Sequence, residues 1–592
     1  MKHELVLKSG TIVDGTGAPS FVCDLAIDDG VITAIGPNLA GEREFDASGA
    51  IVAPGWIDVH THFDGQATWD DELDPSFSNG VTTLVMGNCG VGFAPCPPGG
   101  QDVLVDLMEG VEDIPGTALH EGVPWGEWST FPEYLDFLAA RSYTMDIAAQ
   151  VPHAALRFAV MGERGLANDD ATDADIAQMR QLVAEATQAG AVGFTTSRTI
   201  FHRSISGVPV PGTYATREEL SELVQGMADG GGGVFEAITS ESIGNMRIYG
   251  GERFSEDEEL ALLSDISKAT GQPVTFTTLQ HGDAPDAWRA ALAFAREMNE
   301  TGAHLYPQVA SRPAGFLSGL AGYHPFSRRR TYLEIADLPV HERAAAMRDP
   351  EIRAAILSDS DVEVEQAGSM ENLYKLLRSA IGRSFPLDDI VDYEPSPEQS
   401  FAALAAERGV TLEEAMYDFL AAGDGTNIAA LPGVGYVKGD MEDLREMLVD
   451  PGTIVGLGDA GAHVKLICDG SVPTTQLTHW VRDRTRGERI PLEFMVHKQT
   501  LRNAQLYGFA DRGELAVGKR ADVNVIDFEN LNVHRPVAHA DLPAGGLRYL
   551  QPVEGYVATF VGGVQTRADD TDTGERPGRL LRSHATSSAA QR

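Results

Sequence analysis

Two histidines separated by one residue, His60 and His62, lie in "DVHTHFDGQ", which directly follows the apolar run "IVAPGWI" that predicts a β-strand. Because side chains alternate along a strand, the two rings should lie on the same side. Imidazole is a common metal ligand, and two rings at one strand end could bind one ion. The alternative is that one histidine stabilises a turn while the other hydrogen-bonds nearby backbone. The short motif alone does not decide between them.

Two further residues with metal or proton chemistry follow other apolar runs. Cys89 lies in "TTLVMGNCGVGFAPC" and Asp459 lies in "TIVGLGDAGAH". Each also has a structural explanation, because a cysteine can be a small buried apolar residue and an aspartate can cap the next helix. A shared position at the carboxyl ends of barrel strands would favour one site that contains all of them.

The elements that would position these residues are strand-like runs that alternate with helical stretches. "GVTTLVMGN", "AVGFTTS" and "GGVFEAI" are typical runs, and "DADIAQMRQLVAEATQAG" is a typical helical stretch. Buried strands that alternate with helices predict parallel βα units. About eight such strands predict an α/β fold, the (β/α)₈ or TIM barrel.

Two β-rich pieces flank this region, and together they predict a small β-sandwich built from both termini. Residues 1–54 and residues 509–567 share short alternating strands punctuated by Gly and Asp. The barrel is predicted over residues 55–310 and 451–508. A helix-rich insertion, residues 311–450, interrupts it before the last barrel strand. The polar, turn-rich tail, residues 568–592, is predicted to be disordered.

Composition limits the possible partners and location. The 592 residues contain 45 Lys plus Arg against 87 Asp plus Glu, a net charge of −42, which argues against nucleic acid and anionic membranes. The chain starts without a signal-like apolar segment, contains no run long enough to span a membrane, and has four scattered cysteines. We therefore expect a cytoplasmic protein that acts on a small molecule. A homo-oligomer stays open.

Several motifs resemble the amidohydrolase superfamily. They are "GTIVDGTG", "IVAPGWIDVHTHFD" and the closing "DRGELAVGKRADVNVIDFE". The "GNCG" turn and "GTYATREELSELV" look like the D-aminoacylase, or N-acyl-D-amino-acid deacylase, branch. These matches span nearly the whole chain except the insertion and the tail.

The resemblance implies a site with one or two Zn²⁺ ions. His60 and His62 would be ligands, and Cys89 would be an additional or bridging thiolate. By the same resemblance, Asp459 is the catalytic base that moves a proton from metal-bound water to the leaving amine. Many amidohydrolases use a carboxylated lysine as the bridge. None of the eight lysines follows an obvious barrel strand, which favours the cysteine.

The chain departs from the branch on the fifth and sixth strands, where the resemblance implies further histidine ligands. "GGVFEAITSE" contains no histidine, and "VTFTTLQHG" has Thr278 at the expected position. Glu236 and His281 are the candidate replacements. The candidate substrate-binding residues are Tyr306, Arg198, Arg312 and His463, the two arginines because guanidinium can bind a carboxylate in a bidentate manner.

The function that the resemblance implies is metal-dependent hydrolysis of the amide bond in an N-acyl amino acid, of D configuration. A cyclic-amide hydrolase of the hydantoinase or dihydroorotase type is the enzymatic alternative. The "GNCG" turn and the missing lysine bridge argue against it. A catalytically silent scaffold is the third interpretation, which the missing histidines favour and the retained His60, His62, Cys89 and Asp459 oppose.

Overall fold

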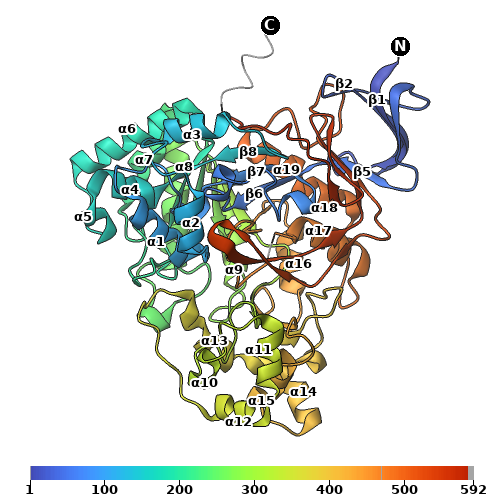
Figure 1. Cartoon of the computed structure of the whole chain (residues 1–592). Helices are drawn as coiled ribbons and strands as arrows, with labels where there is room; N and C mark the ends of the chain where they lie inside the picture. The colour runs from blue at the N-terminus through green and yellow to red at the C-terminus, as the bar shows by residue number, and fades with distance from the viewer. Residues whose placement is uncertain (1, 469, 584–592) are drawn as a thin grey trace.

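A computed structural model describes residues 2–468 and 470–583 and contains a closed parallel barrel at its centre (Figure 1). β8 and β9 are two parts of one strand on either side of Gln150, so the barrel has eight strands. A parallel bridge between Thr61 and Ala460 closes the ring between the first strand and the last. The predicted (β/α)₈ barrel is confirmed. Its strands are β6 (Trp56–Thr61), β7 (Val81–Met86), β8 (Asp146–Ala149), β9 (Val151–Pro152), β10 (Gly193–Ser197), β11 (Val234–Ile238), β12 (Val274–Thr277), β13 (Leu305–Val309) and β17 (Ile454–Val455).

Helices cover the outside of the barrel, so its strands are buried on both faces. Phe235 of β11 and Phe276 of β12 pack with Leu223 and Leu263 in one large apolar cluster. These leucines belong to α7 (Arg217–Asp229) and α8 (Glu256–Thr270). Burial on both faces explains why these strands appear in the sequence as continuous apolar runs. Among the described helices, none is long and apolar enough to cross a membrane.

A small β domain joins the two ends of the chain, as predicted for the β-sandwich. Its strands form one nine-stranded sheet, in which β5 pairs with β18 through Val52 and Val525. Leu7, Leu25 and Phe560 lie in its separate apolar core. The strands are β1 (His3–Ile12), β2 (Phe21–Asp28), β3 (Val31–Gly36), β4 (Gly41–Asp46), β5 (Ile51–Pro54), β18 (Val523–Ile526), β23 (Tyr556–Val561), β24 (Val564–Ala568) and β25 (Thr571–Asp572).

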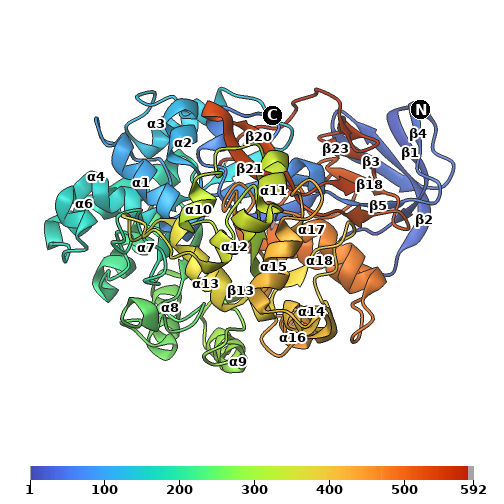
Figure 2. The ribbon, with the colours of Figure 1, turned by 60° about the horizontal axis from the view of Figure 1, so that its bottom comes forward.

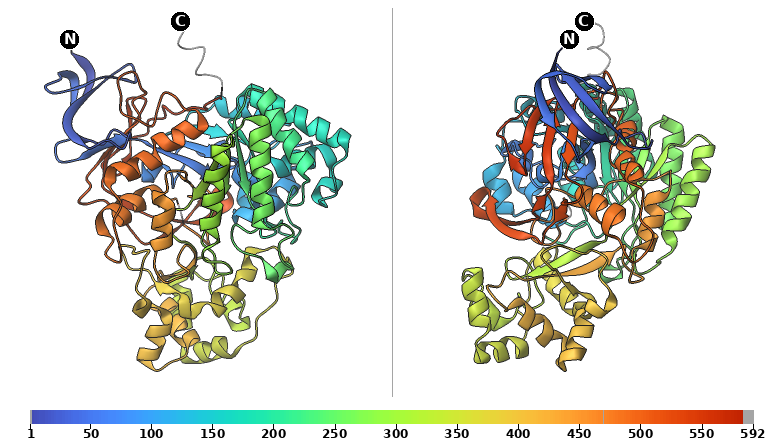
Figure 3. Two further views of the ribbon diagram at one scale, coloured as in Figure 1. Left: turned by 180° about the vertical axis from the view of Figure 1, so that it is seen from behind. Right: turned by 90° about the vertical axis from the view of Figure 1, so that its right-hand side faces the viewer.

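The segment between β13 and β17 projects from one end of the barrel (Figures 1 and 3). In Figure 2 this segment lies in front of the barrel. Leu317 donates a backbone hydrogen bond of 2.7 Å to Leu466, which follows the last barrel strand. Besides helices such as α11 (Val340–Met347), α12 (Pro350–Ser358), α14 (Phe401–Arg408) and α15 (Leu412–Leu420), it contains a small antiparallel sheet. That sheet, made of β14 (Ala314–Gly319), β16 (Ile428–Val434) and β15 (Phe385–Pro386), was not expected, because glycine and proline interrupt its strands.

The prediction of a disordered tail is wrong over residues 568–583, which pack on the rest of the protein. Gly578 and Leu580 form bridges with Tyr143 and Ile147 at the start of the third barrel strand, and Leu580 is only 8% exposed. A polar composition predicts disorder, but here polar residues of the tail bind the rest of the protein. Arg576, for example, forms an ion pair of 2.8 Å with Asp71, in the loop after the first barrel strand. Residues 584–592, also predicted to be disordered, lie outside the described part of the chain.

We expect Leu580→Ala to lower the free energy of unfolding by about 2 kcal/mol, the lower end for removing a buried leucine, because the side chain lies at the edge of the core. Urea denaturation followed by circular dichroism measures this difference. Val517→Ala is the matched control, because Val517 is 65% exposed and should lose only a few tenths of a kcal/mol. Equal stabilities of the two variants would show that the tail does not stabilise the barrel.

Candidate metal centre

Closure of the barrel brings Asp459 beside the two histidines of the first strand. The backbone N–H of Asp459 donates to the His60 carbonyl at 3.1 Å, and the N–H of His62 donates to Ala460 at 2.8 Å. The Oδ1 atom of Asp459 then lies 3.2 Å from Nε2 of His60 and 3.6 Å from Nε2 of His62. Asp459 has a left-handed φ of 41°, and such strain in a non-glycine residue is typical of functional sites.

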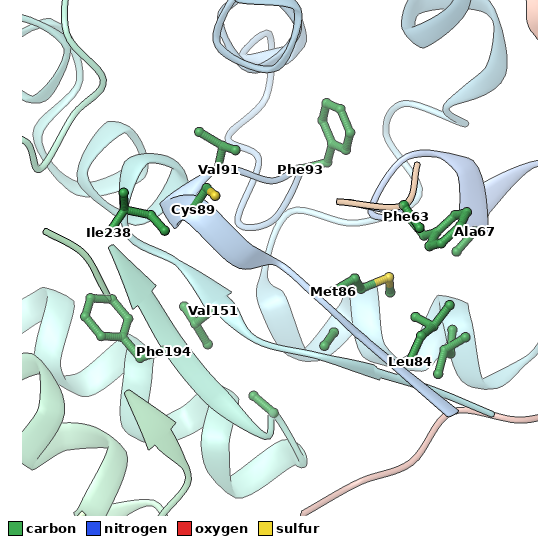
Figure 4. Packing of buried hydrophobic residues seen from close by; sticks show 14 of the residues in the cluster. Phe63, Ala67, Leu84, Met86, Cys89, Val91, Phe93, Val151, Phe194 and Ile238 are labelled. Carbon is green, nitrogen blue, oxygen red and sulfur yellow. The ribbon is translucent and has the colours of Figure 1, made fainter. Parts of the chain in front are cut away.

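A tight turn after β7 places Cys89 at the same end of the barrel, next to Val91 and Ile238 (Figure 4). Cys89 is in the left-handed region with a φ of 56°, between Gly87 and Gly90, which also have positive φ. A Cβ atom at position 90 would lie 2.9 Å from the Ser197 nitrogen, so the turn requires glycine there. The Cys89 Sγ atom lies 3.4 Å from Nε2 of His60.

His60, His62 and Cys89 form a group whose ligand atoms all lie within 4.8 Å of one another; no other such group of His, Cys, Asp or Glu occurs in the described chain. A tetrahedral zinc site with bonds of about 2.1 Å has edges of roughly 3.4 Å. The contacts of 3.4 Å from Cys89 to His60, and of 3.2 and 3.6 Å from Asp459 to the two rings, are close to that edge. Nitrogen, thiolate and carboxylate donors at this spacing fit zinc.

The Nδ1 atom of each ring faces a polar side chain. Nδ1 of His60 donates to Oε1 of Gln308 at 2.7 Å, and Nδ1 of His62 lies 3.4 Å from Oε1 of Glu112. Metal-binding histidines use such partners to direct the other nitrogen to the ion. Both nitrogens of His62 are buried and have no hydrogen bond in the described structure. A buried polar atom without a partner costs free energy, and an ion bound at Nε2 would give one of these two nitrogens a partner.

The electrostatics of the site favour a cation. Burial, with Glu112, Glu236 and Asp459, raises the pKa of the Cys89 thiol well above its usual value. Burial also raises the pKa of Glu236 to about 8 and that of Glu112 to about 7. Burial disfavours a charged His62, yet Glu112 and Asp459 together raise its pKa to about 9. A divalent ion would relieve this crowding of acidic groups.

Of the two candidate replacement ligands, the structure brings Glu236 to the group but not His281. The Cys89 N–H donates to Oε2 of Glu236 at 3.3 Å, and Oε1 of Glu236 is buried without a hydrogen-bond partner in the described residues. His281 lies in the loop after β12 and lines a separate cavity of about 220 Å³, together with Asp283 and Trp288. A role for His281 at this centre is therefore not supported by its position.

The two arginines expected to bind a substrate carboxylate have other partners. Arg198 is buried and forms an ion pair with Glu259 at 2.7 Å. Arg312 donates to Ser471 at 3.1 Å and lies over the ring of Tyr393 at 4.1 Å. Residue type alone could not reveal these contacts, because Glu259 and Ser471 are far from the two arginines in the sequence.

Tyr306 and His463, the other two candidates, lie at different depths. Tyr306 precedes Gln308 on the same face of β13, and its ring lies 5.2 Å from the Arg502 guanidinium, toward the amino-terminal end of the strand. The Tyr306 ring therefore lies away from the group of His60, His62 and Cys89. His463 lies beside the group, because its Nε2 atom lies 3.5 Å from Oε2 of Glu112, whose other oxygen lies 3.4 Å from His62. Burial lowers the pKa of His463 to about 4.

Three residues near the group were missed by the sequence interpretation: Glu112, Gln308 and His202. Gln308 could have been found, because it shares a strand face with Tyr306 and lies nearer the carboxyl end. Nδ1 of His202 lies 2.8 Å from Oγ of Ser197, the last residue of β10, and burial with the charges of His463 and His62 lowers the pKa of His202 to about 3. Glu112 and His202 lie in a helix and a loop whose packing has no local sequence signal.

We expect Cys89→Ala to weaken zinc binding by at least about 100-fold, because losing a ligand should exceed the 10- to 100-fold cost of losing its supporting partner. Chelator competition on the purified protein measures the zinc affinity. Cys96→Ala is the matched control, since Cys96 is also buried but its Sγ atom contacts the Pro97 carbonyl at 3.7 Å. Unchanged zinc affinity in both variants would make Cys89 a packing residue.

Comparison with known proteins agrees with the geometry. The model of the "Amidohydrolase family" matches residues 43–567. A D-aminoacylase of Alcaligenes xylosoxydans xylosoxydans is 28% identical over 588 residues, 98% of this chain and 97% of that protein. An N-acyl-D-glutamate deacylase of the same organism is 28% identical over 606 residues, 100% of this chain and 98% of that protein.

A solved structure extends the similarity to the fold. It is an N-acyl-D-glutamate deacylase from Bordetella bronchiseptica complexed with zinc and a phosphonate inhibitor, with a TM-score of 0.61 and 25% identity. The alignment covers 98% of this chain and 100% of that one. The resemblance first noted in the motifs is thus confirmed along the chain. Since the family model spans most of its length, this protein belongs to the amidohydrolase family.

Proposed function

We propose that this protein is a metal-dependent hydrolase that cleaves the amide bond of N-acyl-D-amino acids. The observation that carries the proposal is the group of His60, His62 and Cys89 beside Asp459 at the carboxyl end of the barrel. Active sites of this fold lie at that end. The names of the relatives, D-aminoacylase and N-acyl-D-glutamate deacylase, support this substrate class.

His60, His62 and Cys89 would hold zinc, and Glu236 offers an oxygen beside Cys89, so we propose one or two ions. Bound zinc supplies a Lewis acid for the amide carbonyl and lowers the pKa of water. The supporting contact from Gln308 keeps the His60 ring in one orientation. The departure from the branch histidines is thus compensated in part by a carboxylate on the fifth strand.

Asp459 is the proposed general base and acid. Burial opposes its ionisation, but His62 and His60 outweigh this and hold its pKa well below the usual range, so Asp459 is ionised at neutral pH. It accepts the proton of the attacking water and delivers it to the nitrogen of the leaving amino acid. The short backbone contacts of residues 459 and 460 to β6 hold the carboxylate in place for both transfers.

The expected setting is the cytoplasm and a small-molecule substrate. The net charge of −42 supports neither nucleic acid nor an anionic membrane as a partner. Arg198 and Arg312 are engaged elsewhere, so we propose that His463 and His202, which lie near the group, contact the substrate. Tyr306 is excluded from this role by its position near Arg502.

A substrate panel tests the function. Zinc-loaded protein is assayed with N-acetyl-D-amino acids, their L enantiomers and 5-substituted hydantoins, and release of the free amino acid or ring opening is measured. We expect the D series alone to be hydrolysed. Asp459→Asn protein prepared in the same way is the blank for hydrolases of the expression host. Hydrolysis of hydantoins instead would favour the cyclic-amide alternative, and no turnover by zinc-loaded protein would favour the silent scaffold.

A further inference from the structure

The helix α1 (Gln101–Glu112) ends in the interior, beside the group of His60, His62 and Cys89, rather than on the surface. Its last residue, Glu112, is 1% exposed, and the chain turns at Asp113, which has a left-handed φ of 52°. A buried carboxylate at the carboxyl end of a helix is unfavourable, both by loss of water and by the helix dipole. Such a residue needs specific partners to offset that cost.

Glu112 contacts two histidines through its two oxygen atoms. Oε1 lies 3.4 Å from Nδ1 of His62, and Oε2 lies 3.5 Å from Nε2 of His463. The carbonyl oxygen of Glu112 also accepts a hydrogen bond from the backbone N–H of His463. One residue therefore connects the first barrel strand to the loop that carries Asp459.

The next residue extends this connection to the insertion. Oδ1 of Asp113 accepts a hydrogen bond from the Tyr323 hydroxyl at 2.6 Å. Oδ2 of Asp113 accepts from the backbone N–H of Lys465 at 3.2 Å. The loop after Asp459 is thus held at residues 463 and 465 by two adjacent residues, and the same pair reaches Tyr323 in the insertion.

We propose that Glu112 is a positioning residue that orients His62 for metal binding and fixes the loop of Asp459. The Glu112 carboxylate, 3.4 Å from Nδ1 of His62, favours a proton on that nitrogen, which leaves the Nε2 lone pair for the ion on the side of Asp459. Through His463 and the neighbouring Asp113, Glu112 also sets the distance between the loop and the strand. This inference rests on the proposed function only in that the ion binds at His62.

The test is the affinity for Zn²⁺ alone, measured by competition with a chromogenic chelator. Glu112→Gln keeps the size of the side chain and removes the charge, and we expect it to weaken zinc binding by about 10- to 100-fold. Glu109→Gln is the matched control, because Glu109 lies one turn earlier on the same helix and is no part of the group. We expect E109Q to bind zinc like the wild type.

Substitution of zinc by Co²⁺ supplies a second readout. The visible absorption of bound Co²⁺ depends on the orientation of its ligands, so E112Q should change this spectrum and E109Q should not. A residue with a merely structural role would lower thermal stability without altering either the affinity or the spectrum. Zinc affinity of E112Q within about threefold of the wild type, together with an unchanged Co²⁺ spectrum, overturns the proposal, since the supporting partners of ligands typically contribute 10- to 100-fold.

Two further comparisons separate the role of Glu112 from a failure to fold and from a failure of the proposed function. Should E112Q fail to fold, Glu112→Asp keeps the charge but draws the carboxylate away from both rings. Weaker zinc binding by E112D supports the proposal, and unchanged binding contradicts it. The affinity measurement involves no substrate. Zinc-loaded wild-type protein that hydrolyses nothing would end the proposed function, whereas only an unaffected E112Q would end the role of Glu112.

Discussion

Asp459→Asn should lower kcat by at least about 100-fold, the usual contribution of a general acid or base, while zinc stays bound to His60, His62 and Cys89. Asparagine keeps the size of the side chain and cannot accept a proton at neutral pH. The carboxylate that asparagine replaces lies 3.2 Å from Nε2 of His60. The backbone N–H of Asp459 donates to the carbonyl of the same histidine, which holds the side chain in place. Steady-state kinetics with an N-acetyl-D-amino acid and zinc analysis of the same sample measure both expectations.

A matched variant separates proton transfer from a general effect of charge. Asp283 follows another barrel strand, β12, and lines a cavity apart from the group, so Asp283→Asn should keep kcat within a few-fold of the wild type. Turnover of D459N close to that of the wild type would remove Asp459 from proton transfer. His463, which lies four residues later and contacts Glu112, would then be the next candidate.

Replacement of both His60 and His62 by alanine should remove at least one zinc ion per chain and abolish hydrolysis. These rings supply two of the three ligand atoms that lie within 4.8 Å of one another, and Cys89 is then the only member of that group left, too few ligands for a tetrahedral zinc site. Elemental analysis of wild-type and variant protein, purified side by side, measures the loss. Circular dichroism checks that the barrel is still folded.

His281→Ala is the informative control for this experiment. The sequence interpretation placed His281 among the ligands, whereas the structure places it in a separate cavity with Asp283 and Trp288. We expect H281A to keep its zinc. Loss of zinc from H281A would restore the ligand role predicted from the sequence, and retention of zinc by the double histidine variant would move the metal site elsewhere.

The barrel and the centre of the site were predictable because each depends on short-range patterns. Strands such as Val81–Met86 and Val234–Ile238 are buried on both faces and therefore appear as continuous apolar runs. His60 lies near the end of such a strand, Cys89 and Asp459 come a few residues after two others, and the ends of parallel strands meet at one end of a barrel. The resemblance to the amidohydrolase superfamily supplied the identity of the chemistry.

The remaining contacts depend on which distant residues pack together, which no local pattern contains. Arg198 was expected to bind substrate, but Glu259 of α8 neutralises it. Glu112 was not among the predicted site residues, although the fold places it between His62 and His463. In the tail, one apolar residue, Leu580, packs on the barrel despite a polar surrounding sequence.

The central claim is that bound metal at this group performs the hydrolysis of N-acyl-D-amino acids. Its most direct test is to strip the wild-type protein with a chelator, assay it with an N-acetyl-D-amino acid, and assay it again after adding back Zn²⁺. The account predicts at least one ion per chain before stripping, loss of hydrolysis after it, and recovery with zinc. Full hydrolysis by protein shown to be metal-free would contradict the account.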